Sequence, residues 1–249
     1  MTVMTRRSSL LVLSLYLSLG ILGTNLEGQD LSQKWRAGLK KVDQELRAGQ
    51  WAAAEKGSSK LSREILEEAG LGEGAAYSLA VVTAFQAIAE AGLGRSDDAA
   101  WHWDVALNLF PDLAKTDLAP YGDAVAALKG RTLRSPDTPR LPHGWTGDPP
   151  VQAGPEIERP KVIANPRPRY PKALERMGTQ GQVVVSVVIG TDGKTYYPLV
   201  HSAQDGGPAM RYVALATLRE WRFEPARLEG KPVPVYYSLT VNFGTKKPD

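Results

Sequence analysis

A proline-rich segment divides this 249-residue chain into two parts with different sequence patterns. Proline lacks a backbone N–H donor and fixes φ, so neither a long helix nor a central strand can continue through such a segment. We therefore expect residues 131–160 to form a semi-rigid, largely polyproline-II linker between a domain at 29–130 and a domain at 161–249. The proline-rich composition itself runs from Arg131 to about Arg169, with prolines at Pro136, Pro139, Pro142, Pro149, Pro150, Pro155, Pro160, Pro166 and Pro168.

The part before the linker has the apolar periodicity of amphipathic helices. Trp35, Leu39, Val42 and Leu46 recur at steps of three and four residues, which places them on one helix face. We expect an all-α domain of helical hairpins over 29–130, and the same pattern predicts its further helices at 51–69, 77–93, 97–110 (with Ser96 as N-cap) and 121–128.

Two sites in this helical part are similar to each other. Gly49 and Gly94, which are 45 residues apart, each end one helix, and an alanine-containing helix begins directly after each of them. The second site resembles the second helix of a tetratricopeptide repeat, although that repeat has 34 residues. We predict an irregular, tetratricopeptide-like array whose stacked hairpins share a core. Trp101 and Trp103 cannot share one helix face, and we expect them to pack in the core and at its rim.

The first 28 residues have the composition of an export leader. Arg6 and Arg7 precede an uncharged apolar run from Leu10 to Leu22. This run is shorter than the ~20 residues that a membrane helix needs, which favours a cleaved signal peptide. No clean small-x-small cleavage site follows it, so an uncleaved N-terminal membrane anchor is the alternative. Both interpretations place the rest of the chain outside the cytoplasm.

The part after the linker alternates between strand and helix patterns. The β-branched run from Gln182 to Ile189 predicts a strand, and Asp192-Gly193 predicts a hairpin turn after it. The complete expected order is helix, strand, strand, helix, strand, over residues 172–177, 182–189, 194–202, 206–221 and 234–243. This order predicts an α+β fold.

In this order, the C-terminal part resembles the C-terminal domain of the TonB family. The residues that carry the resemblance are Tyr170-Pro171, Gly178, Gly181, the valine-rich strand, Asp192-Gly193-Lys194, Val200 with Ser202, Trp221-Arg222-Phe223, Pro225-Ala226, Gly230-Lys231-Pro232-Val233, and Val241 with Phe243. The resemblance implies two helices packed on one face of a three-stranded antiparallel sheet. It also implies a periplasmic protein of the bacterial cell envelope that binds a peptide segment of an outer-membrane TonB-dependent transporter and passes on work from an inner-membrane proton-motive motor.

The last predicted strand would have an unpaired edge. A partner's extended segment can add to such an edge through main-chain hydrogen bonds. The predicted partner-binding residues follow this strand, with one dipeptide expected beside it: Val235, Tyr236, Tyr237, Ser238, Leu239, Thr240, Val241, Asn242 and Phe243, with Tyr170 and Pro171.

One departure from the family concerns the motor. Known TonB proteins carry a serine and a histidine in the membrane segment that engages it, whereas the run from Leu10 to Leu22 has Ser14 and Ser18 but no histidine. A soluble periplasmic adaptor with two protein-binding domains and no motor coupling is therefore an alternative function. A homodimer that pairs its own edge strands is a further one.

Enzymatic chemistry has no positive signal in the sequence. The chain has no cysteine, and its three histidines, His102, His143 and His201, are isolated from one another, which argues against a metal site. The sequence contains no phosphate-binding loop and no nucleophile elbow. The formal charge of +3 is too small to indicate nucleic-acid binding. We therefore expect no catalytic, cofactor-binding or metal-binding residues and no nucleic-acid partner.

Overall fold

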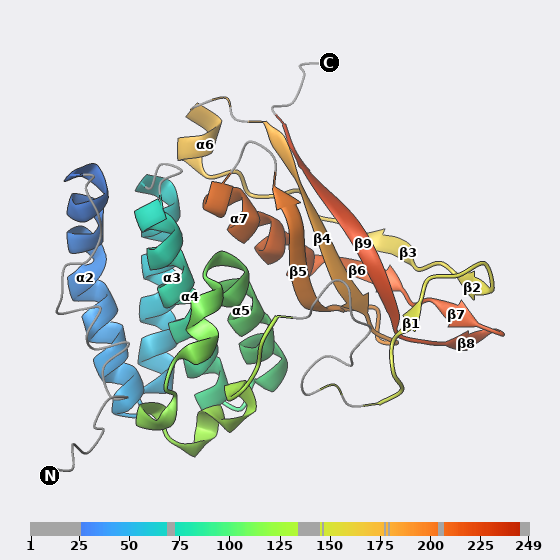
Figure 1. Cartoon of the computed structure of the whole chain (residues 1–249), viewed down its shortest axis with the longest axis horizontal. Helices are drawn as coiled ribbons and strands as arrows, with labels where there is room; N and C mark the ends of the chain where they lie inside the picture. Colours follow the sequence, from blue (N-terminus) through green and yellow to red (C-terminus); the bar gives the residue numbers. More distant parts are fainter. Residues whose placement is uncertain are drawn as a thin grey trace, which may run out of the picture.

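The computed structural model describes residues 26–68, 73–133, 145, 147–176, 178, 180–203 and 207–244 (Figure 1). The expected leader falls mostly on residues 1–25, which lie outside the described residues, as does His143. The chain is an α+β protein, as the sequence predicts, with a helical region followed by a sheet. Helix α7 lies between that sheet and the helical region (Figure 1).

The described helical region consists of two helical pairs and three short 3-10 turns. Its elements are α2 (Leu26–Arg47), α3 (Trp51–Glu68), α4 (Glu73–Gly92), α5 (Ser96–Leu109), η1 (Pro111–Lys115), η2 (Ala119–Tyr121) and η3 (Asp123–Leu128). The α-helix expected at 121–128 is therefore a 3-10 turn. Ser96 is the first helical residue and not the N-cap, which is Arg95 and has no side-chain capping bond.

Helix α4 forms the centre of this region because it is apolar on every side. Its residues from Ser78 to Phe85 are all buried, and most of them are alanine or aliphatic. Small side chains allow neighbouring helices to approach closely. The ring of Trp51 lies so close to Gly92 that a Cβ at this glycine would be 2.2 Å from it.

The C-terminal region contains a four-stranded sheet with the order β1-β9-β4-β5. Its elements are α6 (Lys172–Arg176), β4 (Gly181–Ile189), β5 (Thr195–Ala203), α7 (Gly207–Glu220), β6 (Arg222–Glu224), β7 (Arg227–Leu228), β8 (Lys231–Pro232) and β9 (Val235–Phe243). β4 pairs antiparallel with both β5 and β9. The valines at odd positions of β4 are buried against α7, as their alternation predicts.

The described second half of the proline-rich segment lies against the sheet. β1 (Val151–Gln152) pairs in parallel with β9, β2 (Ile157–Glu158) pairs with β7, and β3 (Lys161–Ala164) pairs with β6. β1 therefore adds a fourth strand to the expected three. Residues 147–160 thus differ from the semi-rigid, largely polyproline-II linker that we expected, because short pairs of non-proline residues form strands between the prolines.

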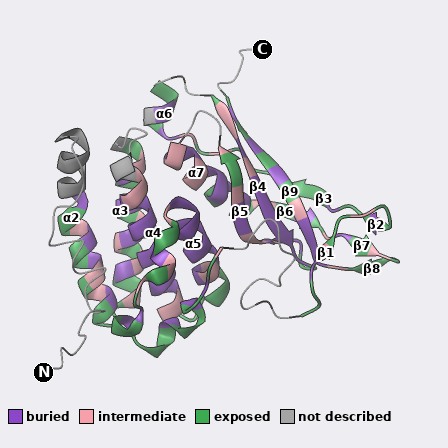
Figure 2. Ribbon diagram, in the orientation of Figure 1, coloured by how far each residue is buried: buried purple, intermediate pink, exposed green. Residues whose placement is uncertain are grey.

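Helix α5 connects the two regions. Trp101 and Val105 belong to the core of the sheet, whereas Trp103 and Leu107 belong to the core of the helical region. Figure 2 shows buried residues throughout α4, α5 and β4. Both tryptophans are 2% exposed, so α5 is buried on two faces and each region completes the core of the other.

Candidate binding edge of the sheet

Strand β9 has one edge that is only partly covered. It pairs with β4 along its whole length, from Val235 to Phe243. At its other edge, β1 reaches only Val235 and Tyr236. From Tyr237 to Phe243 this second edge has no strand partner among the described residues, so seven of the nine predicted strand residues lie on an open edge.

The backbone groups that face this open edge can be identified from β1. The N–H of Val151 donates to the carbonyl of Pro234 over 2.9 Å, so that carbonyl points away from β4. Backbone groups alternate in direction along a strand, and the register between β4 and β9 is continuous. The N–H and C=O groups of Ser238, Thr240 and Asn242 therefore point toward the open edge.

Side chains of β9 alternate between the core and solvent. Leu239, Val241 and Phe243 are buried beside α7, whereas Ser238, Thr240 and Asn242 are exposed. The residues whose backbones face the open edge thus have small polar side chains on the outer face of the sheet. An extended segment can approach these backbone groups without a bulky side chain in its path.

Tyr170 lies at the far end of this edge. Its ring packs against the ring of Phe243, with 5.7 Å between centroids. The Tyr170 hydroxyl is buried without a hydrogen-bond partner among the described residues. Burial raises the pKa of this phenol above its usual range, and the charge of Glu175 adds to the effect. A pocket of about 320 Å³ adjoins the ring, and it is lined by Arg167, Pro168, Tyr170, Glu175, Asn242, Phe243 and Gly244.

Helix α5 covers the middle of the opposite edge of the sheet, on β5 (Thr195–Ala203). The side-chain amide of Asn108 accepts a hydrogen bond from the N–H of Val200 and donates one to the carbonyl of Pro198, each over 2.8 Å. These are two backbone groups of β5. The amide side chain thus satisfies β5 as a neighbouring strand would, and α5 occupies the space that such a strand would need.

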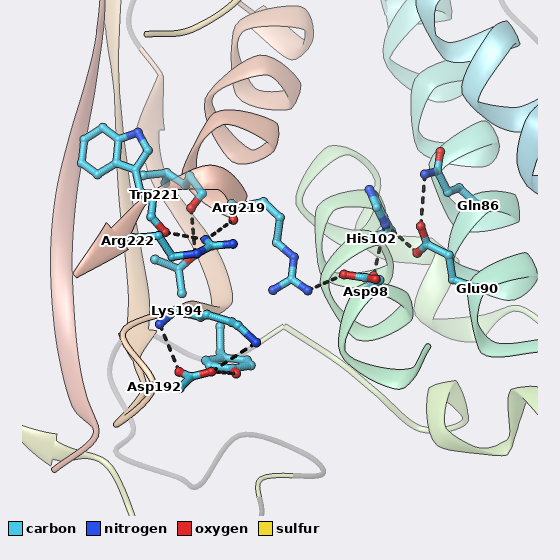
Figure 3. A network of polar contacts seen from close by, with 12 residues as sticks. Gln86, Glu90, Asp98, His102, Asp192, Lys194, Arg219, Trp221 and Arg222 are labelled. Atoms are coloured by element: carbon cyan, nitrogen blue, oxygen red, sulfur yellow. Dashed lines mark hydrogen bonds and ion pairs between the residues drawn. The ribbon is translucent and has the colours of Figure 1, made fainter. Parts of the chain in front are cut away.

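Charged contacts also join the helical region to the C-terminal region (Figure 3). Arg219 of α7 forms an ion pair with Asp98 of α5 at 2.5 Å. Burial favours the protonated form of Asp98, but Arg219 outweighs it and holds the pKa of this carboxyl below its usual range. His102 is hydrogen-bonded to the buried carboxylate of Glu90 at 2.7 Å.

Sequence patterns did not reveal these connecting residues. Asn108 and Arg219 each occupy the last turn of a helix, and neither differs from an ordinary surface residue in sequence. His102 and His201 both take part in hydrogen bonds, with Glu90 and Ser186 respectively. Among the described residues, no cluster of three or more His, Asp or Glu side chains could hold a metal ion. Within the same residues, no helix has the length and hydropathy needed to cross a membrane.

Comparisons with known proteins match the C-terminal region. Residues 166–245 match the family model for the Gram-negative bacterial TonB protein C-terminal. Protein TonB of Vibrio cholerae is 26% identical over 88 residues, which cover 35% of this chain and 36% of that protein, so the chain spans about a third of its length. The solution NMR structure of the Pseudomonas aeruginosa TonB CTD covers 40% of this chain and 97% of that one, at 25% identity and a TM-score of 0.31.

The TM-score is low, so the family match is based on the two sequence comparisons. Both of them agree with the resemblance carried by Tyr170-Pro171 and the residues that follow it. The described helical region, at 26–133, lies outside the family model. Residues 166–245 of this chain therefore match the C-terminal domain family of TonB proteins.

Proposed function

We propose that this chain is a TonB-like envelope protein that binds a peptide segment of an outer-membrane transporter and supports energy-coupled transmembrane transport. The observation that carries the proposal is that the open strand edge lies within the residues that match the family. The family match covers residues 166–245, and the last strand of that same region leaves its edge open from Tyr237 to Phe243. Tyr170 and Pro171, at the far end of this edge, belong to the proposed site.

Strand addition explains how such an edge would bind. Ser238, Thr240 and Asn242 each offer one donor and one acceptor to an incoming extended segment. A main-chain hydrogen bond contributes a net ~0.5–1.5 kcal/mol, so a short segment gains affinity from the backbone and selectivity from neighbouring pockets. A row of such bonds resists being pulled along the strand, which suits a protein that transmits force.

The alternative is a soluble periplasmic adaptor that binds one protein through each region and has no contact with a motor. The dense contacts of α5 with both cores suit this function, because they would hold two binding surfaces in a fixed relation. Determining the mature N-terminus in the native bacterium separates the two functions. Cleavage near residue 28 with recovery in the soluble periplasm favours the adaptor, and retention in the inner membrane favours the transducer.

The substitution Thr240→Pro tests the strand-addition proposal. The N–H of Thr240 faces the open edge, and proline is tolerated in an edge strand where its missing N–H faces solvent. We expect Thr240→Pro to fold but to recover transporters from solubilised envelopes at least about tenfold less, a loss of ~1.4 kcal/mol in binding. Thr240→Val, which keeps the N–H, is the matched control.

A second proline variant controls for damage to the sheet. The N–H of Val241 points toward β4, so Val241→Pro removes an internal bond of the sheet and should destabilise the protein itself. Circular dichroism and thermal unfolding distinguish the two variants. Undiminished recovery of transporters by a folded Thr240→Pro variant would exclude this edge as the binding site.

A further inference from the structure

A groove of about 700 Å³ lies between the helical region and the C-terminal region. Helix α3 provides one wall through Arg63 and Leu66, and helix α7 provides the other through Tyr212 and Ala216. The segment at 167–172 completes its lining. The groove thus exists only because the helical region packs against a TonB-type domain, and the family match does not include α3.

The groove has an apolar floor. Leu66 and Tyr212 are partly buried, and each packs against the cores of both regions. Burial raises the pKa of the Tyr212 hydroxyl, which makes a side-chain hydrogen bond with Ser62 of α3. These contacts hold α3 and α7 at a fixed separation, so the groove is preformed. A preformed apolar floor can receive an aliphatic side chain at little entropic cost.

The charged residues of the groove are mostly cationic. None of them forms an ion pair with another described residue. Four carry positive charge and two carry negative charge: Arg63, Arg167, Arg169 and Lys172 against Glu67 and Glu220. Unpaired cations around an apolar floor complement a segment that carries acidic residues next to an aliphatic one.

The groove continues from the open edge of β9. Arg167 and Tyr170 line both this groove and the smaller pocket that contains Asn242 and Phe243. An extended segment that leaves β9 at Phe243 therefore meets residues that also form the groove. Six further residues in extended conformation span about 20 Å, which exceeds the reach of any single side chain.

From this continuity and charge we infer that the groove binds acidic, aliphatic-containing residues that flank the strand-forming segment of the same transporter peptide. Helix α3 would then select among transporters by the sequence beside the added strand. This inference rests on the proposed function, since it takes the peptide on β9 as its starting point. It assigns to the helical region a part in recognition that the edge strand alone does not supply.

The test uses the full chain and synthetic peptides that tile the periplasmic segments of the outer-membrane transporters of the native bacterium. The shortest peptide that binds, and whose binding Thr240→Pro weakens, is compared with versions extended by six native residues at either end. We expect acidic native extensions to lower Kd at least fivefold. The double variant Arg63→Glu/Arg169→Glu should abolish this gain and leave the Kd of the short peptide unchanged.

Lys40→Glu/Lys56→Glu is the matched control, because it makes the same change in net charge at two exposed positions that do not line the groove. The inference is overturned if the extended peptide keeps its lower Kd with the Arg63→Glu/Arg169→Glu variant (the groove variant). It is also overturned if the control removes that gain in affinity equally. The absence of any gain from acidic extensions overturns it as well. A change in sedimentation mass of the groove variant would identify a second copy of this chain as the occupant, which also overturns it.

The two proposals fail in different ways. If Thr240→Pro and Thr240→Val bind every peptide equally, the strand-addition proposal fails, and the groove inference fails with it as stated. If Thr240→Pro weakens the short peptide but the groove variant leaves the gain from extension intact, only the groove inference fails. Raising the salt concentration gives an independent readout, because it should weaken the extended peptide more than the short one.

Discussion

The side-chain oxygen of Asn108, in helix α5, accepts a hydrogen bond from the backbone N–H of Val200, in strand β5, over 2.8 Å. The amide nitrogen of the same side chain donates to the carbonyl of Pro198. A helix side chain thus binds the edge of a sheet as a strand would. Helix α5 thus covers this part of β5, whereas the outer edge of β9 has no strand partner from Tyr237 to Phe243 among the described residues.

We expect Asn108→Leu to destabilise the protein. Leucine has the same number of side-chain heavy atoms but cannot satisfy the backbone groups of Val200 and Pro198, and Asn108 is only 8% exposed. A buried polar group left without a partner costs roughly 1–3 kcal/mol, so the free energy of unfolding should fall by about 2 kcal/mol in urea titrations. Asn108→Asp keeps the acceptor and loses the donor, and it should be destabilising as well. A loss below about 0.5 kcal/mol for Asn108→Leu would mean that these bonds are formed equally well to water.

Breaking the ion pair between Arg131 and Asp104 should destabilise the protein more than Asn108→Leu does. Two hydrogen bonds of 2.7 and 2.6 Å join the guanidinium to the carboxylate, and both side chains are at most 5% exposed. Asp104→Ala leaves a buried cation unpaired, which typically costs about 3–5 kcal/mol. Calorimetry or urea unfolding should show this loss. The double variant Asp104→Leu/Arg131→Met should be more stable than Asp104→Ala, because neither charge is then buried alone.

Local patterns predicted the positions of most elements. The apolar spacing of Trp35, Leu39, Val42 and Leu46 indicates α2, and all four of these residues are buried. The valine alternation likewise gives β4 within a residue of its observed bounds. These predictions succeed because a periodic apolar face fixes the type of element whatever it packs against.

Contacts between distant parts of the chain could not be predicted in this way. The spacing of Trp101 and Trp103 shows that they lie on different faces of α5, but not that each face meets a different core. Nor could proline content reveal that Val151 and Gln152 pair with β9, since proline restricts only its own backbone and that of its neighbours. The last strand was expected to have an unpaired edge, whereas β1 pairs with its first two residues, and this pairing has no local signal in the sequence.

Gly193 combines one property that its local sequence predicts with one contact that it does not. The Asp192-Gly193 pair predicts the hairpin turn, and Gly193 has the positive φ of 74° that such a turn requires. The structure adds a second constraint, because a Cβ at this position would lie 2.0 Å from the carbonyl oxygen of Phe223. Gly193→Ala should therefore cost more than the ~1–2 kcal/mol of a left-handed alanine.

Gly230 provides the comparison for this prediction. It has a φ of 77°, but a Cβ there would meet nothing within 4 Å. Gly230→Ala should therefore show only the conformational cost, of ~1–2 kcal/mol, and thermal unfolding of the two variants isolates the effect of the contact with Phe223. Equal losses of stability would show that the strand end at Phe223 moves aside freely.

The ion pair between Asp98 and Arg219 predicts a dependence of stability on pH. Because the pKa of Asp98 is lowered in the folded protein, this carboxylate stabilises the fold at pH values above its unfolded pKa, about 3.9. The contribution is lost as the pH falls through the lower pKa of the folded state. Asp98 is 41% exposed, so solvent screening limits the contribution to below about 1 kcal/mol.

The substitution Asp98→Asn tests this dependence. It should lower the free energy of unfolding at pH 7. The difference from the wild type should begin to shrink in urea titrations below about pH 4, where the carboxyl of the unfolded chain becomes protonated, and should vanish once the pH is below the lower pKa of the folded state. A difference of the same size at about pH 7 and about pH 3 would mean that the substitution removes a hydrogen bond and not a charge. The contact between Asp98 of α5 and Arg219 of α7 would then contribute nothing to the acid sensitivity of the fold.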